Sequence, residues 1–489
     1  MTRQPAMFGL VRGISFGLFG PPDEFAPQAA GLGAELVRVY LYWSQIEPRP
    51  GEYDWRIVDA LLDQVPAQMG IWVTVCSSSP WGTRQPTDFQ PQSPAVDDTA
   101  YESFVAALVQ RAAGRIAYWQ CNNEVSNTGI LWAGTAEEYG HQLKHFARAV
   151  RRSDPRAHVV LAGCGYDALS GPPDSPARAV YETLLRDHGE HFDTFALNLY
   201  GDPYAIPENV AWVRGLMRRH RCERRIIVGE YNGPTVFEFP QAIAVLEATM
   251  AAAFAGALEP ANHAEGTSMS LDRLAEQVTA DSPDRIALRG LYADPDSLPA
   301  ALRMFMHDPP ADLDALRDRI ACRQLVQRAV LILSTDIDTL VCWSLAPEIG
   351  GYSDPLNIMD LMFGTLALMD YRDGRIAETR PEGLTHRLMA TRLGGATSVE
   401  RIALEQDAAA HVYRVTRGDD SWGLVAWAEQ DDPLDESQPT IPMRIEWPFD
   451  EPDAVDVFGS AAAADWDGET RRLRLELTAT PIFVTERGR

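Results

Sequence analysis

Short apolar runs alternate with amphipathic segments over the first 345 residues of the chain. The segment 135–150 has apolar residues at helical spacing, and its first residues, Thr135 and Glu138, form a capping-box pair. Continuous apolar runs are typical of parallel strands buried on both faces. Eight such runs occur, at 12–17, 35–43, 70–76, 115–121, 157–164, 193–200, 224–230 and 338–345. Eight strands alternating with helices predict an α/β fold of the (β/α)8 TIM-barrel type.

A doubly wound sheet is the alternative arrangement for such a pattern. No GxGxxG motif opens a helix after the first run, which argues against a dinucleotide-binding fold of that kind. The barrel is therefore the predicted fold.

The regular spacing of the strands is broken once, between strands seven and eight. More than 100 residues separate these two runs, and structureless segments of that length are rare. We therefore predict a long helical insertion at about 240–320. It leaves the carboxyl end of a strand, the face on which barrel enzymes carry their active sites. The insertion could wall or cap a pocket, or it could be a peripheral addition or an oligomer contact.

The pattern changes to alternating apolar and polar residues after the predicted closing helix at 381–395. Segments of this kind lie at 411–430, 441–449, 454–460 and 471–484, and they predict a small antiparallel β-domain. We place a catalytic barrel at 1–395 and a C-terminal β-sandwich domain at 396–489. Trp422 and Trp427 could bind sugar there, but we expect them in its core, with the domain packed against the barrel.

The overall charge excludes several classes of partner. The chain has 489 residues, of which 46% are hydrophobic, and a formal net charge of -26. With no basic segment to neutralise phosphates, we expect no nucleic acid partner and no anionic membrane surface. No window reaches the apolar length of a membrane-spanning helix.

The cysteines and the N-terminus predict a cytoplasmic protein. None of the six cysteines has CxxC spacing, and four lie in apolar strand-like runs, as buried reduced thiols do: Cys76, Cys121, Cys164 and Cys342. The first 20 residues lack a basic segment followed by a long apolar run, so we expect no signal peptide. The histidines, His263 and His307 among them, show no paired spacing, so we expect no metal and no cofactor.

Two glutamates stand at strand ends. Glu124 follows the fourth run in IAYWQCNNE, and Glu230 ends the seventh in RRIIVGE. Residues at these positions project into the mouth of a barrel, and strands four and seven lie across that mouth from one another. Two converging carboxylates suit glycoside hydrolysis, because one can be protonated to donate to the leaving oxygen while the other stays ionised.

These residues carry a resemblance to a known group of enzymes. Asn123-Glu124, Glu230 and the segment LVRVYLYWSQIEPRPGEYDWRIVD (36–59) resemble clan A of the glycoside hydrolases, the retaining barrel enzymes that include β-xylosidases and β-galactosidases. The resemblance implies that Glu124 is the acid/base and Glu230 the nucleophile. It also implies that Asn123 binds the sugar 2-hydroxyl.

Further substrate-site residues follow from the same resemblance. Arg38, in the second run, resembles the clan's arginine beside the nucleophile; a buried arginine needs an anion, and Glu230 or some other acid could supply it. Tyr200 matches an aromatic residue that hydrogen-bonds the nucleophile. Trp343 resembles the tryptophan that floors the sugar subsite, although a core position is the alternative.

Other positions leave the exact family open. Trp81 could line the pocket or pack under a loop. Val125 stands where many clan members have proline, and Asn198 stands where histidine is common. The sugar, the linkage and the choice between pyranose and furanose therefore stay open.

We expect a retaining O-glycosidase that acts by double displacement on a carbohydrate substrate, with exo-action on small glycosides or oligosaccharides. The carboxyl groups should then lie about 5–5.5 Å apart, against roughly 6.5–9.5 Å for inversion. The alternatives are an endo-acting glycanase or a transglycosidase on the same barrel, and a non-catalytic carbohydrate-binding barrel. Homo-oligomerisation is left open.

Overall fold

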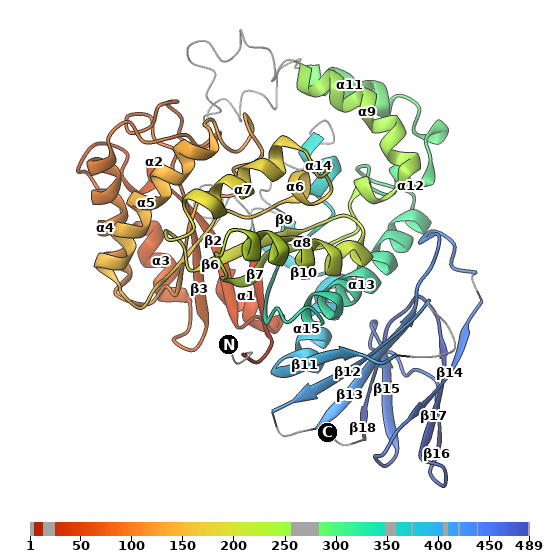
Figure 1. Cartoon of the computed structure of the whole chain (residues 1–489). Helices are drawn as coiled ribbons and strands as arrows, with labels where there is room; N and C mark the ends of the chain where they lie inside the picture. Colours follow the sequence, from red (N-terminus) through yellow and green to blue (C-terminus); the bar gives the residue numbers. More distant parts are fainter. Residues whose placement is uncertain are drawn as a thin grey trace.

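The chain forms a closed barrel of eight parallel strands in sequential order, as predicted (Figure 1). The computed structural model describes residues 4–12, 25–255, 283–347, 358–372, 375–403, 409–418, 421–437 and 439–487. The barrel strands are β1 (Met7–Val11), β2 (Leu36–Tyr42), β3 (Gly70–Cys76), β4 (Tyr118–Cys121), β5 (His158–Val160), β6 (Thr194–Leu199), β7 (Arg225–Tyr231) and β8 (Thr339–Cys342).

The predicted position of the first strand is wrong. The strand is Met7–Val11 rather than 12–17, and residues 13–17 of the predicted run lie outside the described residues. The sequence MFGLV closes the barrel by pairing with both β2 and β8. A side chain at Gly9 would come within 2.8 Å of the carbonyl oxygen of Leu36, so the close approach of these two strands requires glycine.

Helices cover the outside of the barrel. The predicted helix at 135–150 is α5, and both hydrogen bonds of the capping box between Thr135 and Glu138 are present. The main outer helices are α1 (Phe25–Gly31), α3 (Arg56–Gln64), α4 (Asp98–Ala112), α5 (Ala136–Ser153), α7 (Pro176–Asp187), α8 (Ile206–Arg219), α13 (Ala311–Leu333) and α15 (Pro381–Leu393). Short helical turns after strands are α2 (Trp43–Ile46), α6 (Tyr166–Leu169) and η1 (Pro203–Ala205).

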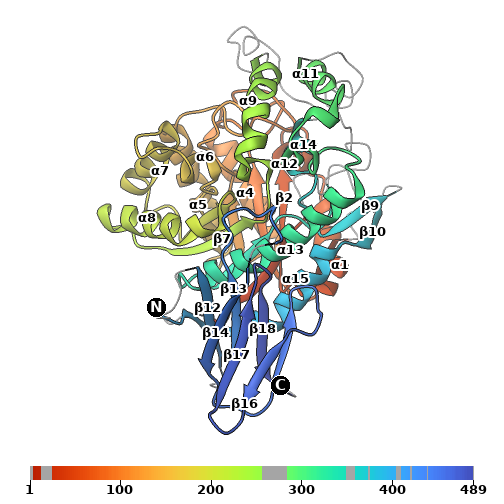
Figure 2. The same ribbon diagram turned by 90° about the vertical axis from the view of Figure 1, so that its right-hand side faces the viewer.

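The segment between β7 and β8 is helical in its described parts. It contains η2 (Val236–Glu238), α9 (Pro240–Ala255), α11 (Pro283–Tyr292), η4 (Pro295–Ser297) and α12 (Ala300–Arg303) before α13. These elements have an apolar cluster of their own, which includes Leu246, Leu288 and Phe305. The second half of α13 is buried and packs against α8 and α15, so α13 is the regular barrel helix. In both views α9 and α11 lie at the opposite end of the molecule from the C-terminal strands (Figures 1 and 2).

Three elements that the sequence did not predict follow β8. They are the helix α14 (Ile358–Phe363) and a hairpin of β9 (Met369–Arg372) and β10 (Arg375–Thr379). The predicted closing helix then follows as α15.

The C-terminal part consists of two antiparallel sheets. One has the order β11-β12-β13-β18-β15 and the other β14-β17-β16. Strands such as β17 alternate exposed and buried residues, as the pattern predicted. The strands are β11 (Ala396–Arg401), β12 (Ala410–Arg417), β13 (Trp422–Ala428), β14 (Ile441–Glu446), β15 (Pro452–Asp456), β16 (Ala464–Asp467), β17 (Arg472–Leu477) and β18 (Ile482–Glu486).

These sheets pack against the barrel through α13, α15 and η1. Gln327 of α13 donates to the carbonyl of Ala479, and the indole nitrogen of Trp427 lies 3.0 Å from the hydroxyl of Tyr204. Trp427 is fully buried, and Trp422 packs edge-on against another tryptophan of the domain. Trp427 thus packs at the contact with the barrel rather than in the core of the C-terminal domain, and Trp422 packs at the edge of that core. Within the described residues, no helix is both long and apolar enough to cross a membrane.

Candidate active site

The carboxylate of Glu230 lies near the carboxyl end of β7 and is surrounded by hydrogen-bond donors. Its Oε1 accepts from Arg38 Nη1 at 2.8 Å, from the hydroxyl of Tyr40 at 2.6 Å and from Asn123 Nδ2 at 3.4 Å. Its Oε2 accepts from the hydroxyl of Tyr200 at 2.9 Å. One cation and three neutral donors form a site suited to an ionised carboxylate.

Arg38 is held rigidly beneath this carboxylate. Its side chain is fully buried, and its pairing partner is Glu230 rather than another acid. The remaining donors reach the carbonyl of Gly229 at 2.8 Å, Asn123 Oδ1 and Gln120 Oε1 at 3.1 Å each, and Thr74 Oγ1 at 3.2 Å. Because the planar guanidinium is fixed on every side, it orients Glu230 as well as balancing its charge.

Glu124 occupies a different environment at the end of β4. Its backbone has a φ of 44°, and Asn198 Nδ2 donates to its Oε1 at 2.6 Å. A side chain at Gly165 would come within 2.6 Å of the carboxyl carbon, so only glycine leaves room for this group. Burial, followed by the negative charge of Glu230, raises the pKa of Glu124 to about 8. Glu124 is therefore mainly protonated at neutral pH.

The two carboxylates are joined through a pair of asparagines. Asn198 Nδ2 lies 3.5 Å from Asn123 Oδ1, and these two residues hydrogen-bond Glu124 and Glu230 respectively. Asn198 of β6 is also the register partner of Glu230 on β7. The arrangement thus brings a protonated acid and a carboxylate with a fixed counter-charge together at the barrel mouth.

The two predicted tryptophans differ in their surroundings. Trp343 directly follows β8, is partly exposed, and meets the ring of Tyr40 edge-on at 6.2 Å, so it lies beside the group that binds Glu230. Trp81 packs edge-on against Trp43 at 5.1 Å and donates to the carbonyl of Glu47 at 3.0 Å. These contacts give Trp81 a packing role under a loop, and its contact with substrate stays a prediction.

Sequence reasoning missed several residues of the site. Tyr40 lies two positions after Arg38 on β2, so the period of a strand places both on one face. Tyr40 could therefore have been predicted from the position of Arg38. Thr74 and Gln120, which fix Arg38, are polar residues within apolar runs. Asp167 in α6 carried no signal, yet its negative charge adds to the causes that raise the pKa of Glu124.

Elements that follow β7 and β8 reach the mouth of the barrel. Phe363 of α14 meets the ring of Tyr200 at 6.3 Å, and Phe237 of η2 stacks on Tyr166 at 5.9 Å. Both phenylalanines pack against the apolar cluster of the inserted helices. The insertion is therefore continuous with the wall around the two carboxylates.

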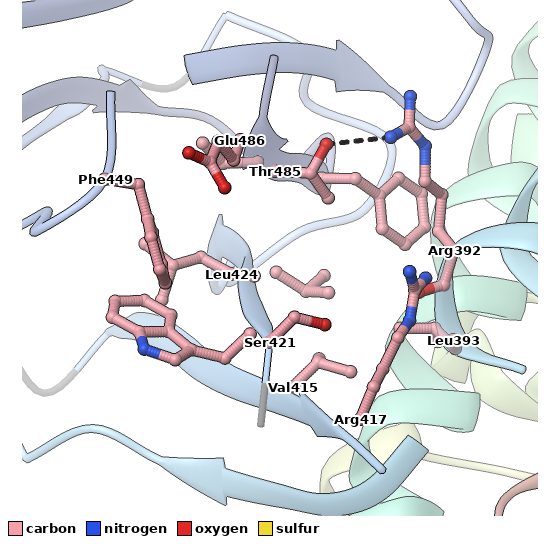
Figure 3. Close-up of a pocket in the computed structure, with 14 residues that line it drawn as sticks. Arg392, Leu393, Val415, Arg417, Ser421, Leu424, Phe449, Thr485 and Glu486 are labelled. Atoms are coloured by element: carbon pink, nitrogen blue, oxygen red, sulfur yellow. Dashed lines mark hydrogen bonds between the residues drawn. The ribbon is translucent and has the colours of Figure 1, made fainter. Parts of the chain in front are cut away.

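A pocket between α15 and the C-terminal sheet lies elsewhere in the molecule (Figure 3). Arg392 and Arg417 line it, and Arg392 donates to Thr485 at 2.9 Å. Glu486 is its one carboxylate. A single carboxylate cannot perform the paired chemistry described above, so the candidate site is the one with Glu124 and Glu230.

The expectation that no histidines have paired spacing is wrong. His141 and His145 lie one turn apart on α5, and with Asp98 they bring three metal-binding atoms within 4.8 Å of one another. This cluster lies on the outer helices rather than at the two carboxylates.

Comparisons with known proteins agree with the fold. No family model matches the sequence. A probable alpha-L-arabinofuranosidase C of Aspergillus clavatus is 24% identical over 192 residues, which cover 36% of this chain and 34% of that protein. The match thus spans about a third of the relative's length.

Solved structures are similar over nearly the whole chain. A family 39 glycoside hydrolase of Bacteroides cellulosilyticus WH2 has a TM-score of 0.60 at 12% identity, covering 99% of this chain and 81% of its own. A glucosidase of Croceicoccus marinus has a TM-score of 0.57 at 12% identity, covering 99% and 95% respectively. The chain therefore has the (β/α)8-barrel fold of the clan A glycoside hydrolases, as its resemblance to that clan predicted.

Proposed function

We propose that the protein is a retaining O-glycoside hydrolase with Glu124 as acid/base and Glu230 as nucleophile. The observation that carries the proposal is the contrast between the two carboxyl groups. Glu124 has a pKa raised to about 8 by burial and by its acidic neighbour, whereas Glu230 faces Arg38 and two tyrosine hydroxyls. Environments that separate an acid from a base in this way assign the two roles of double displacement.

The chemistry follows from these roles. In the first step a carboxylate oxygen of Glu230 attacks the anomeric carbon, the glycosidic C–O bond breaks, and Glu124 gives its proton to the departing oxygen. In the second step Glu124 takes a proton from water, which attacks the same carbon and releases Glu230 as the carboxylate. Tyr40, Tyr200 and Arg38 hold Glu230 in position, and the contact that we propose for Asn123 is with the sugar 2-hydroxyl.

We further propose exo-action on small glycosides or oligosaccharides. The support is the wall formed by Phe237, Phe363 and the inserted helices at one side of the mouth. An endo-acting glycanase would require an open cleft across the barrel. A transglycosidase would use the same two steps with a sugar hydroxyl in place of water.

The proposed location is the reducing cytoplasm. All six cysteines are free and buried, and burial raises the pKa of Cys121 to about 12, so these thiols are unreactive. A carbohydrate is the only partner that we propose.

The experiment is hydrolysis of a panel of nitrophenyl glycosides by the wild type and by Glu230→Gln. The panel includes β-D-glucoside, β-D-xyloside, β-D-galactoside and α-L-arabinofuranoside, because the similar proteins include a glucosidase and a probable arabinofuranosidase. We expect one glycoside to be cleaved by the wild type and a loss of at least about 10³-fold in kcat/KM in the variant.

A matched control separates catalysis from folding. Glu238 is also a buried glutamate paired with a buried arginine, Arg328 at 2.9 Å, but it accepts from Thr235 rather than from groups that contact Glu124 or Glu230. Glu238→Gln should keep its activity. A folded wild type that is inert on the whole panel and on oligosaccharides would favour a non-catalytic carbohydrate-binding barrel.

A further inference from the structure

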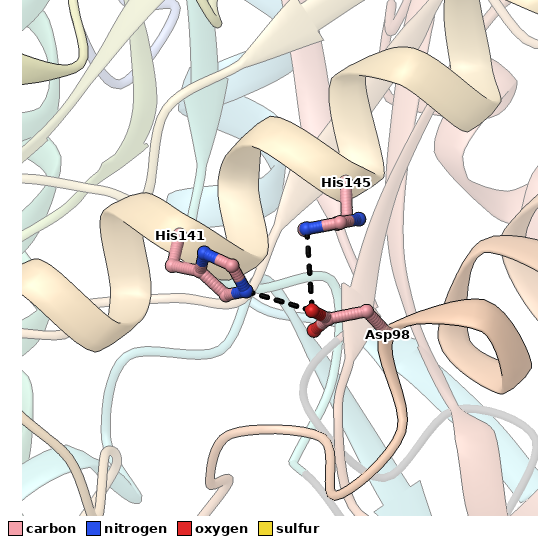
Figure 4. Close-up of side chains that lie close together, drawn as sticks. All are labelled: Asp98, His141 and His145. Carbon is pink, nitrogen blue, oxygen red and sulfur yellow. Dashed lines mark hydrogen bonds and ion pairs between the residues drawn. The ribbon is translucent and has the colours of Figure 1, made fainter.

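Three side chains with metal-binding atoms meet on the outer surface of the barrel, between α4 and α5 (Figure 4). Asp98 lies in the first turn of α4, and His141 and His145 lie on the facing side of α5. Asp98 Oδ2 is 2.8 Å from His141 Nε2 and 3.4 Å from His145 Nε2. Three donors from two helices thus converge on one point.

A second carboxylate prepares one of the imidazoles for binding. His145 Nδ1 is 2.6 Å from Glu102 Oε1, one turn further along α4. A carboxylate at Nδ1 holds the proton there, so the lone pair of Nε2 points toward Asp98 and His141. Arg148 lies 3.0 Å from the same oxygen of Glu102 and balances its charge.

We propose that Asp98, His141 and His145 bind a divalent transition-metal ion of the Zn²⁺ type and thereby join α4 to α5. Zinc binds imidazole nitrogen and carboxylate oxygen at about 2.0–2.2 Å. The three donor atoms lie within 4.8 Å of one another, so side-chain rotations can bring them around one ion. Two imidazoles and one carboxylate favour zinc, nickel and copper over magnesium and calcium. The fourth position faces solvent, since Asp98 and His141 are exposed, and water can occupy it.

This site is independent of the proposed glycosidase activity. It lies on the outer helices that follow β3 and β4, and its histidines hydrogen-bond Asp98 and Glu102 rather than Glu124 or Glu230. The expected effect of the metal is therefore on stability rather than on turnover. Binding to the native state alone raises the melting temperature in proportion to the logarithm of the free metal concentration.

The test is calorimetric titration of tag-free, metal-stripped full-length protein with ZnCl₂, together with thermal melts. We expect one Zn²⁺ per chain, a raised Tm, and no such effect from MgCl₂ or CaCl₂. His141→Asn and His145→Asn should each abolish the stoichiometric binding. Glu102→Gln should weaken it 10–100-fold, the usual loss when the partner of a metal-binding histidine is removed.

The control is His307→Asn. His307 is also an exposed histidine beside an aspartate, 3.4 Å from Asp308, but among the described residues it belongs to no group of three metal-binding side chains. The His307→Asn variant should bind zinc as the wild type does. Absence of stoichiometric zinc binding by the folded wild type would overturn the proposal and leave a plain histidine–aspartate ion pair. Binding that survives both cluster variants would overturn it equally.

Discussion

Replacing Arg38 with methionine should destabilise the barrel strongly. Methionine keeps much of the side-chain length but removes the cation, while Glu230 stays buried; the two side chains are 0% and 6% exposed. Removing one partner of a buried ion pair costs about 3–5 kcal/mol, because the remaining charge is left without compensation. The acceptors on Gly229, Asn123 and Gln120 also lose their donor, which places the expected loss at the upper end of that range.

A double-mutant cycle isolates the part due to the ion pair. Urea unfolding at pH 7, followed by tryptophan fluorescence, gives the free energy of unfolding of the wild type, Arg38→Met, Glu230→Gln and the double variant. Because glutamine carries no charge, the double variant should recover about 2–3 kcal/mol relative to the sum of the single losses. A single variant within about 1 kcal/mol of the wild type, or a cycle without coupling, would refute this reasoning.

Four further predictions follow from named contacts. Because Glu124 must be protonated to act as an acid and its pKa is raised to about 8, kcat/KM should fall as pH rises through about 8; an unchanged rate up to pH 10 would contradict this. Asp167→Asn removes a negative charge near Glu124 and should move this alkaline limb to lower pH, whereas no movement or an upward one would exclude the interaction. Tyr200→Phe removes a 2.9 Å hydrogen bond to Glu230 and should lower kcat by about 10- to 100-fold with the fold intact, as checked by circular dichroism. Thr135→Ala removes the cap of α5 and should cost about 1 kcal/mol of stability without changing kcat, as measured by urea unfolding and turnover.

The raised pKa of Glu124 also makes the stability of the protein depend on pH. Its pKa is about 4.5 in an unfolded chain and about 8 in the native state, so the native state binds more protons between these values. The contribution of this group to stability is therefore fully present below pH 4.5 and is lost as pH rises through 8. Burial makes the ionised form of Glu124 unfavourable at high pH, and the same burial suits the protonated form to proton donation.

Much of the barrel could be predicted from the sequence because its strands are buried on both faces. Each such strand is a continuous apolar run, and seven of the eight predicted runs overlap observed barrel strands. The first strand was misplaced because MFGLV is short and interrupted by Gly9, so its pattern was no clearer than that of the neighbouring run at 12–17. Met369 is the one buried residue of strands β9 and β10, and the hairpin carries no apolar pattern.

Residues of the candidate site could be predicted where their position on a strand determines the direction of the side chain. Glu124 and Glu230 follow from strand ends alone. Asp167 lies in a short turn after β5, and its distance from Glu124 depends on how that loop folds over the barrel. The proximity of Asp98 to His141 likewise depends on the packing of two helices, which no local pattern encodes.

The most direct test of the central claim is trapping of the covalent intermediate. A 2-deoxy-2-fluoro glycoside of the sugar found in the nitrophenyl panel, with a good leaving group, should inactivate the enzyme. The fluorine slows both steps by destabilising their oxocarbenium-like transition states, and the good leaving group speeds only the first, so the glycosyl-enzyme accumulates. Peptide mapping by mass spectrometry should then locate one glycosyl unit on Glu230. A label on another residue, or turnover with inversion of the anomeric centre in proton NMR, would contradict the assignment of Glu230 as nucleophile.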